Sequence, residues 1–206
     1  MTLEIIIRWL GGLFAFTTLV IVLYGIWRGT QRQAGLMTGR TATWVRSPWF
    51  YLISLTLFLL ISFFGWTPLP VTPTSQTRTS LLVFGSLLYF PGMVLVLWGR
   101  LALGKNYFVS TGFGAQLFAG HQLVTTGPFA IVRHPMYLGL TLAAWGGLLI
   151  YATWTTLLFA LFAPLTVVRA HREETALALA FGEQWREYCQ RVPAFVPRLR
   201  LWRKRS

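Results

Sequence analysis

The chain has 206 residues, of which 55% are hydrophobic, 16% aromatic and only 11% charged, and its mean hydropathy is +0.58. An average soluble domain carries about 25% charged residues, so this composition excludes an ordinary soluble globule, and the high hydrophobicity excludes intrinsic disorder. The formal net charge of +13 arises from 18 Lys and Arg against five Glu. In so apolar a chain this excess indicates loops that face an anionic membrane surface, and we expect no nucleic-acid partner.

Charge-free runs predict the first three membrane spans, since a helix needs about 20 apolar residues to cross a hydrocarbon core of about 30 Å. The first run covers Trp9 to Trp27 and is interpreted as a retained span, because it is too long for a secretory signal. The second lies within residues 47–71. The third runs from Thr79 to Gly99 and contains Pro91-Gly92, which predicts a kink. Together these spans form a predicted N-terminal domain, residues 1–100.

The second predicted domain, residues 101–206, begins with a stretch rich in glycine and polar residues. Residues 106–132 are therefore interpreted as a loop with short helical pieces. Residues 134–168 carry no formal charge, and as one straight helix they would reach about 52 Å, well beyond the thickness of the membrane core. We predict a helical hairpin over about 135–168, with its turn near residues 151–154.

The positive-inside rule supports this choice. With five crossings, the basic loop 28–46, the connection 100–133 and the tail after Arg169 share one face, which is predicted to be cytoplasmic. The fold class is thus an all-α, multi-pass integral membrane protein of about five transmembrane helices, in the plasma or inner membrane if the source is prokaryotic. It follows that His134 and Glu173, at the two ends of the hairpin, lie at the same membrane surface.

After Arg169 the spacing of Leu177, Phe181 and Tyr188 predicts a cytoplasmic helix that lies against the bundle. Pro193 and Pro197 are expected to end this helix, and the alternating basic and apolar residues 198–205 suit a lipid headgroup region. The single cysteine, Cys189, permits no internal disulfide, and the spacing of His and Cys predicts no metal site.

Two clusters contain most of the groups able to support chemistry. Residues 133–139 read Arg-His-Pro-Met-Tyr-Leu-Gly, and downstream lie the pair Glu173-Glu174 and the dipeptide Phe181-Gly182. In this combination the chain resembles the isoprenylcysteine carboxyl methyltransferase family and its phospholipid methyltransferase relatives, over roughly residues 101–197. One departure is Phe129, at a place where family members often have tyrosine.

The resemblance implies an S-adenosyl-L-methionine-dependent methyltransferase. Arg169, Glu173 and His134 are the predicted catalytic residues, and the resemblance places Arg169 at the methyl acceptor. Asn106, which follows the third span, is a second predicted contact to the acceptor, with a surface turn as the alternative. Contacts to the cofactor are carried over to the following residues: His121, Gln122, Leu123, Val124, Phe129, His134, Pro135, Met136, Tyr137, Glu173 and Glu174. No general base is assigned, and His134, His171 and Glu174 are only candidates for that role.

Residue chemistry is compatible with these roles. A carboxylate at Glu173 accepts hydrogen bonds from an amino group or a ribose diol, and Arg169, four residues earlier, shares its helical face. The reaction would be an in-line displacement that depends chiefly on holding the two reactants together. The acceptor is left open among a prenylcysteine-like carboxylate, a phospholipid amine and a small thiol, all lipophilic molecules reaching a site among membrane lipids.

Plainer interpretations remain open for the same residues. Arg133 at the end of a span is equally well a positive-inside anchor, and both glutamates have arginines nearby with which to pair. Two alternative functions are a membrane reductase of the sterol reductase type that uses NADPH, and a non-catalytic membrane protein that binds lipid or a partner. The length of 206 residues argues against the reductase, because sterol reductases are much longer.

Overall fold

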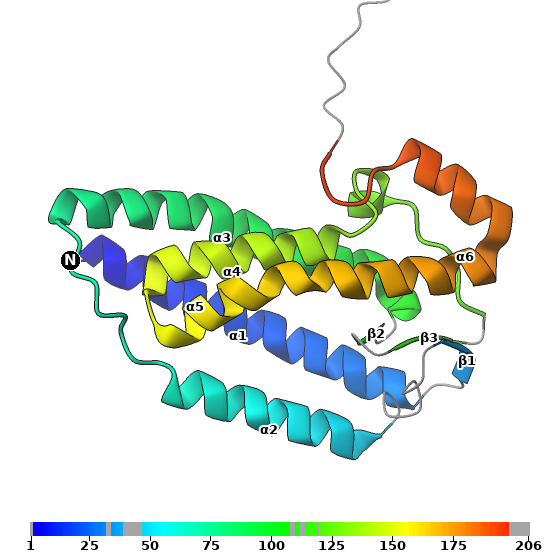
Figure 1. Cartoon of the computed structure of the whole chain (residues 1–206), viewed down its shortest axis with the longest axis horizontal. Coiled ribbons are helices and arrows are strands. Elements are labelled where there is room, and N and C mark those ends of the chain that lie inside the picture. The colour runs from blue at the N-terminus through cyan, green and yellow to red at the C-terminus, as the bar shows by residue number, and fades with distance from the viewer. Residues whose placement is uncertain are drawn as a thin grey trace, which may run out of the picture.

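The computed structural model describes residues 2–31, 34–38, 47–107, 110–111, 114–118 and 120–197. Its helices lie roughly along the long axis of the molecule; α1 to α4 alternate in direction, and α5 continues into α6 (Figure 1). The helices are α1 (Thr2–Thr30), α2 (Pro48–Phe64), α3 (Ser75–Leu103), α4 (Pro135–Tyr151), α5 (Trp154–Phe162) and α6 (Thr166–Arg191).

Within the described part of the chain, three helical segments are long and apolar enough to cross a membrane: Leu3–Arg28, Ser75–Asn106 and Trp154–Arg191. Two shorter apolar helices, Trp49–Phe64 and Pro135–Tyr151, lie among them. A helix of 17 residues such as α4 reaches about 25 Å, near the lower limit for a crossing. The predicted class, an all-helical polytopic membrane protein, is confirmed.

A small sheet adds a feature that the sequence did not predict. Strands β1 (Ala34–Thr38), β3 (Gly114–Phe118) and β2 (Ser110–Thr111) pair antiparallel in that order. The sheet links the connection after α1 to the connection after α3. Most of the predicted basic loop, including Arg32, Arg40 and Arg46, and the basic tail 198–205 lie outside the described residues.

Helices α3 and α4 form the closest helix pair, and glycines on both sides permit it. A Cβ added at Gly139 would lie 2.5 Å from the Gly92 carbonyl oxygen, and one added at Gly146 would lie 2.5 Å from the Tyr89 nitrogen. Such small-residue contacts let helix backbones approach within a membrane. Helix α3 continues through Pro91, which the sequence marked as a kink.

The predicted hairpin turn is confirmed at residues 152–153. Ala152 caps α4 in the left-handed conformation, and the side chains and backbones of Thr153 and Thr156 form a reciprocal capping box that begins α5. After α5, the short 3₁₀ turn η4 (Ala163–Leu165) leads into α6, so the chain returns toward the end from which α4 started.

Helix α6 changes direction at Gly182, whose φ of 52° is a conformation that favours glycine. The last turns then fold back over the start of α4 (Figure 1). There the backbone nitrogens of Arg133 and His134 donate to the carbonyls of Pro193 and Ala194, at 2.8 and 3.0 Å. This bend, which the sequence did not predict, brings the C-terminal segment to the start of α4.

Candidate functional site

The site is built around the first residue before α4. His134 is only 5% exposed, and its ring lies between two glutamates of α6. Its Nε2 is 2.9 Å from a carboxylate oxygen of Glu174, and its Nδ1 is 4.0 Å from one of Glu173. The predicted meeting of residues 134 and 173 across the helical hairpin is therefore confirmed.

Arg133 secures this arrangement from the outer side. Its Nε and Nη2 donate to one oxygen of Glu174 at 3.0 and 2.9 Å, while Nη1 donates to the carbonyls of Val192 and Cys189 at 2.8 and 3.3 Å. One guanidinium thus joins the start of α4, the middle of α6 and the end of α6. The simple membrane-anchor interpretation of Arg133 does not account for these contacts.

Glu173 has different surroundings from its neighbour. The Tyr137 hydroxyl donates to its carboxylate, and the Arg169 guanidinium lies over the Tyr137 ring, 5.6 Å from the ring centroid. Residues one apart on a helix point about 100° away from each other, so Glu173 faces inward while Glu174 faces Arg133. The two adjacent acids therefore have separate roles.

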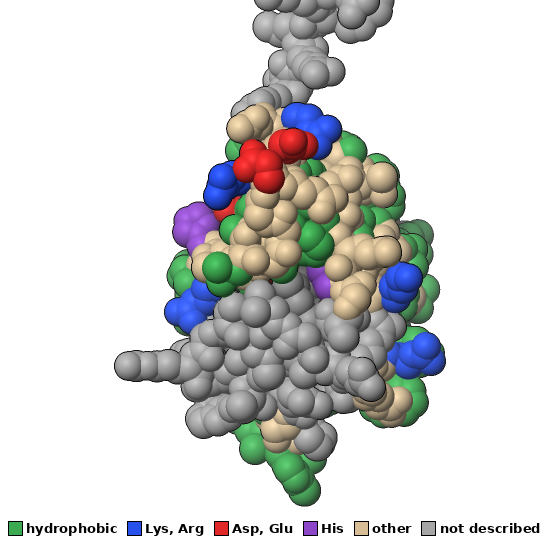
Figure 2. All heavy atoms as spheres, turned by 90° about the vertical axis from the view of Figure 1, so that its right-hand side faces the viewer, with side chains coloured by type: hydrophobic (Ala, Val, Ile, Leu, Met, Phe, Trp, Pro, Cys, Tyr) green, Lys and Arg blue, Asp and Glu red, His purple; other side chains and the backbone are tan. Residues whose placement is uncertain are grey.

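A cavity of about 110 Å³ opens beside Glu173. Its walls are largely apolar and aromatic, with a few convergent polar groups, which is the usual composition of a small-molecule site. The lining residues are Leu103, Tyr107, His121, Leu123, Val124, Phe129, Arg133, His134, Pro135, Met136, Tyr137, Glu173, Leu177, Trp185 and Tyr188. Figure 2 looks onto this end of the molecule and shows basic, acidic and histidine side chains around the edge of the described surface.

The segment 120–126 forms one wall of the cavity. The side-chain oxygen of Asn106 accepts a hydrogen bond from the Gln122 backbone nitrogen at 3.1 Å, which fixes the segment to the end of α3. Burial lowers the pKa of His121 below its ordinary value, so this ring is neutral at pH 7. Its ring packs against that of Phe181 at 5.9 Å. This wall offers neutral hydrogen-bonding and apolar groups.

Most of the predicted cofactor residues come together at the cavity. His121, Leu123, Val124, Phe129, His134, Pro135, Met136, Tyr137 and Glu173 line it. The other predicted residues, Gln122, Asn106, Arg169 and Glu174, stand behind the lining or beside it, in the contacts described above.

Two aromatic groups in the walls were not predicted from the sequence. Trp185 and Tyr188 both line the cavity, and the Tyr188 hydroxyl donates to the Phe129 carbonyl at 2.7 Å. They reach it because α6 bends at Gly182. The sequence signal was the positive-φ propensity of that glycine inside an otherwise regular helical pattern.

Chemically, the cavity suits a ligand that combines a flat apolar ring with a cation or a diol. Glu173 supplies an acceptor-only carboxylate, and the apolar residues Leu123, Val124 and Leu177 supply surfaces for a ring. The Arg133 guanidinium is already shared between Glu174 and two carbonyls.

Comparison with known proteins agrees with this chemistry. The family model described as phospholipid methyltransferase matches residues 80–184. The chain is 30% identical over 174 residues to methanethiol S-methyltransferase 1 of Bradyrhizobium diazoefficiens, an alignment covering 75% of the chain and 54% of that relative. It is 37% identical over 79 residues to a protein-S-isoprenylcysteine O-methyltransferase of Schizosaccharomyces pombe, 37% of the chain and 34% of the relative. Over 79 residues it is also 38% identical to a Delta(14)-sterol reductase of Mus musculus, 36% of the chain but 18% of the reductase.

Proposed function

Because the chain belongs to the phospholipid methyltransferase family, we propose that it is an integral membrane methyltransferase that uses S-adenosylmethionine and methylates a lipophilic acceptor. The alignment spans only 54% of the methanethiol methyltransferase, so the activity rests on the site as well as on the relatives. The observation that carries the proposal is the shared cavity between His134 and Glu173, which assembles the residues expected at a cofactor site.

The residues present fit S-adenosylmethionine. This cofactor supplies an electrophilic methyl group on a sulfonium, together with an ammonium, a carboxylate, a ribose diol and an adenine. Glu173 is placed to accept from the ammonium or the diol, and the neutral His121 with the backbone of 122–124 forms a wall that suits an uncharged adenine. The apolar lining excludes water, which strengthens each of these polar contacts.

The chain's own residues divide into those that bind and those that position. Glu173 and His134 face the ligand, while Arg133 and Glu174 act through them by locking the start of α4 onto α6. Tyr137 donates to Glu173 and thereby fixes the direction of its carboxylate. We assign most of the rate enhancement to this positioning, which is worth up to about 7–11 kcal/mol in favourable cases.

We propose that the acceptor binds next to Arg169 and Asn106. Arg169 lies over the Tyr137 ring, one helical turn before Glu173, and Asn106 ends the turn η2 (Gly104–Asn106) beside the segment 120–126. Both residues belong to candidate membrane-spanning segments, Ser75–Asn106 and Trp154–Arg191. A thiol, a carboxylate and a phospholipid amine are the acceptor classes that we propose to compare. The site is expected on the cytoplasmic side, by the positive-inside argument.

A reductase function is less well supported by the walls of the cavity. A nicotinamide dinucleotide carries several phosphate charges and requires cationic or backbone partners for them. Among the lining residues that the structure describes, Arg133 is the only arginine or lysine, and its donors are bound to Glu174 and to backbone carbonyls. A carboxylate facing the ligand suits a sulfonium or an ammonium better than a phosphate.

Isothermal calorimetry on the detergent-purified protein tests the proposal. We expect S-adenosylhomocysteine to bind and NADPH not to bind. Glu173→Gln is expected to lower the affinity for S-adenosylhomocysteine by about 10- to 100-fold, because it removes a charged hydrogen-bond acceptor. Glu187→Gln, on an exposed part of the same helix, is the matched control and is expected to bind normally.

Two results would contradict the proposal. Binding of NADPH alone would favour the reductase, and binding of neither compound would favour a non-catalytic protein. Methyl transfer from labelled S-adenosylmethionine to the three acceptor classes, measured on the same preparation, then identifies the class that is methylated.

A further inference from the structure

A second and larger cavity lies at the opposite end of the bundle. It has a volume of about 490 Å³ and is lined by α1, α3, α4 and α5 together with Trp66. This volume is within the range of about 300–1,000 Å³ typical of ligand sites. Its walls are mostly apolar and include Gly12, Ala144 and Phe159. None of its lining residues belongs to the cavity beside Glu173.

Specific contacts hold this cavity open. The hydroxyl of Tyr89 donates to the Gly11 carbonyl and that of Tyr151 donates to the Arg8 carbonyl, both at 2.8 Å. These bonds fix α1 to α3 and α4. At Gly12, by contrast, an added Cβ would meet no atom within 4 Å. The space is thus present because α1 carries a glycine where a larger side chain would fill it.

The cavity also has a polar margin, where Arg8 lines it beside Trp9 and Trp66. Tryptophans 77% and 52% exposed are typical of the boundary between lipid tails and headgroups. Arg8 and Arg78 share the single carboxylate of Glu4, at 2.9 and 2.6 Å, so this three-residue cluster keeps a net positive charge. The Arg8 side chain remains 42% exposed, and its Nε is buried without an acceptor among the described residues.

We propose that this cavity is a binding site for an anionic phospholipid of the surrounding bilayer. One acyl chain lies between α1 and α5, along Gly12 and Phe159, and the phosphate lies at Arg8. The anion complements the uncompensated charge of the Arg8–Arg78–Glu4 cluster and accepts hydrogen bonds from the guanidinium. The apolar walls accept a hydrocarbon chain directly from the membrane.

Native mass spectrometry of the full-length protein, released from detergent after titration with defined lipids, tests this proposal. We expect phosphatidylglycerol to bind about tenfold more tightly than phosphatidylcholine of the same chain length. Arg8→Gln is expected to abolish this preference, and Arg8→Lys to retain most of it. Gly12→Leu, which fills the cavity, is expected to weaken the tight binding of phosphatidylglycerol at least tenfold.

Two substitutions on the same helix serve as controls. Arg28→Gln removes an exposed cation at the other end of α1, and Leu13→Phe adds bulk on a 63% exposed position beside Gly12; both are expected to bind phosphatidylglycerol like the wild type. Equal affinity of the wild type for the two lipids overturns the anionic preference. Undiminished binding to Gly12→Leu overturns the cavity as its location, and Ala144→Leu on the facing wall replaces that variant if it does not fold.

Discussion

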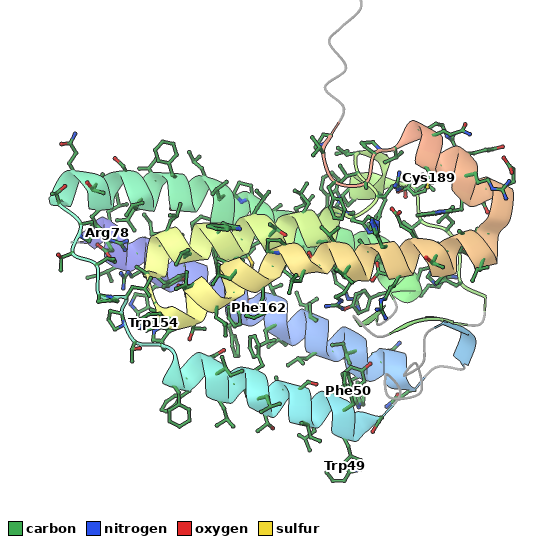
Figure 3. All side chains as sticks on the ribbon, viewed as in Figure 1. Trp49, Phe50, Arg78, Trp154, Phe162 and Cys189 are labelled. Carbon is green, nitrogen blue, oxygen red and sulfur yellow. The ribbon has the colours of Figure 1, made fainter. Side chains whose placement is uncertain are left out.

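At each end of the bundle one arginine donates to both a glutamate and backbone carbonyls, an arrangement called here an arginine fork: Arg78 with Glu4 at one end and Arg133 with Glu174 at the other. At one end Arg78 donates through Nε and Nη2 to Glu4, at 3.1 and 2.6 Å, and also to the carbonyls of Leu149 and Ile150 near the end of α4. At the other end Arg133 makes the same pattern with Glu174 and two carbonyls at the end of α6. Figure 3 labels Arg78 and Cys189 at these two ends.

The difference lies in what adjoins each fork. Beside Arg133 are His134 and a second glutamate, Glu173, which faces a cavity with polar and aromatic walls. Beside Arg78, Glu4 is shared with Arg8, which lines a mostly apolar cavity. An arginine fork therefore joins helices at either end, and the chemistry depends on which further groups it leaves facing a cavity.

The largest effect is expected from breaking the two forks in turn. Arg133→Gln and Arg78→Gln each leave a half-buried glutamate with fewer partners, so each is expected to lower the free energy of unfolding by about 1–3 kcal/mol. Only Arg133→Gln is expected to weaken the binding of S-adenosylhomocysteine, by about 100-fold, because it releases Glu174 and His134. Thermal unfolding and calorimetry measure the two quantities separately. Equal binding by both variants would remove the distinction between the ends.

Between the two ends of the bundle, glycines hold α3 and α4 in close contact, and substitutions there test how much this packing contributes to stability. Gly139→Ala places a methyl group 2.5 Å from the Gly92 carbonyl oxygen, and Gly85→Ala places one 2.9 Å from the Ile150 side chain. Both are expected to destabilise the protein by about 1–3 kcal/mol through overpacking, with the larger cost at Gly139, where the nearest obstacle is a backbone atom and lies closer. Gly12→Ala, which meets open space, is the control for thermal unfolding. A higher unfolding temperature for Gly139→Ala would contradict the close packing.

Acidic pH is expected to affect the site end selectively through His121. Burial lowers the folded pKa of this ring below its ordinary 6.5, so the unfolded chain binds a proton first and stability falls as the pH decreases below about 6.5. His121→Asn is expected to reduce this loss, whereas the exposed His171→Asn is not. Unfolding temperatures between pH 5 and 8 measure the effect. Identical pH profiles for wild type and His121→Asn would exclude this origin.

The smallest effect on stability is expected at Thr155, at the start of α5 beside the hairpin turn. The Thr155 hydroxyl lies 3.1 and 3.4 Å from the carbonyls of Ser62 and Ile61 and so joins α5 to α2. Thr155→Val removes this link and is expected to cost about 1 kcal/mol in thermal unfolding, with unchanged affinity for S-adenosylhomocysteine. Thr155→Ser, which keeps the hydroxyl, is the control. A loss of cofactor affinity in Thr155→Val would mean that the two ends are coupled.

The sequence by itself determined the all-helical membrane class and the helical hairpin. These features depend on local quantities: the length of charge-free runs and the turn near residues 151–154. The meeting of His134 and Glu173 followed from the predicted hairpin, because a hairpin returns the chain to the surface it left.

Only the tertiary structure decided the separate roles of residues that are adjacent in the sequence. Adjacent glutamates look alike in the sequence, but the helical rotation turns Glu173 to the cavity and Glu174 to Arg133. The bend at Gly182 carries Trp185 onto the cavity, and the packing of α1 against α4 and α5 leaves a second cavity at Gly12. These outcomes depend on contacts between segments distant in sequence, whose geometry is set by how helix surfaces fit together rather than by local propensity.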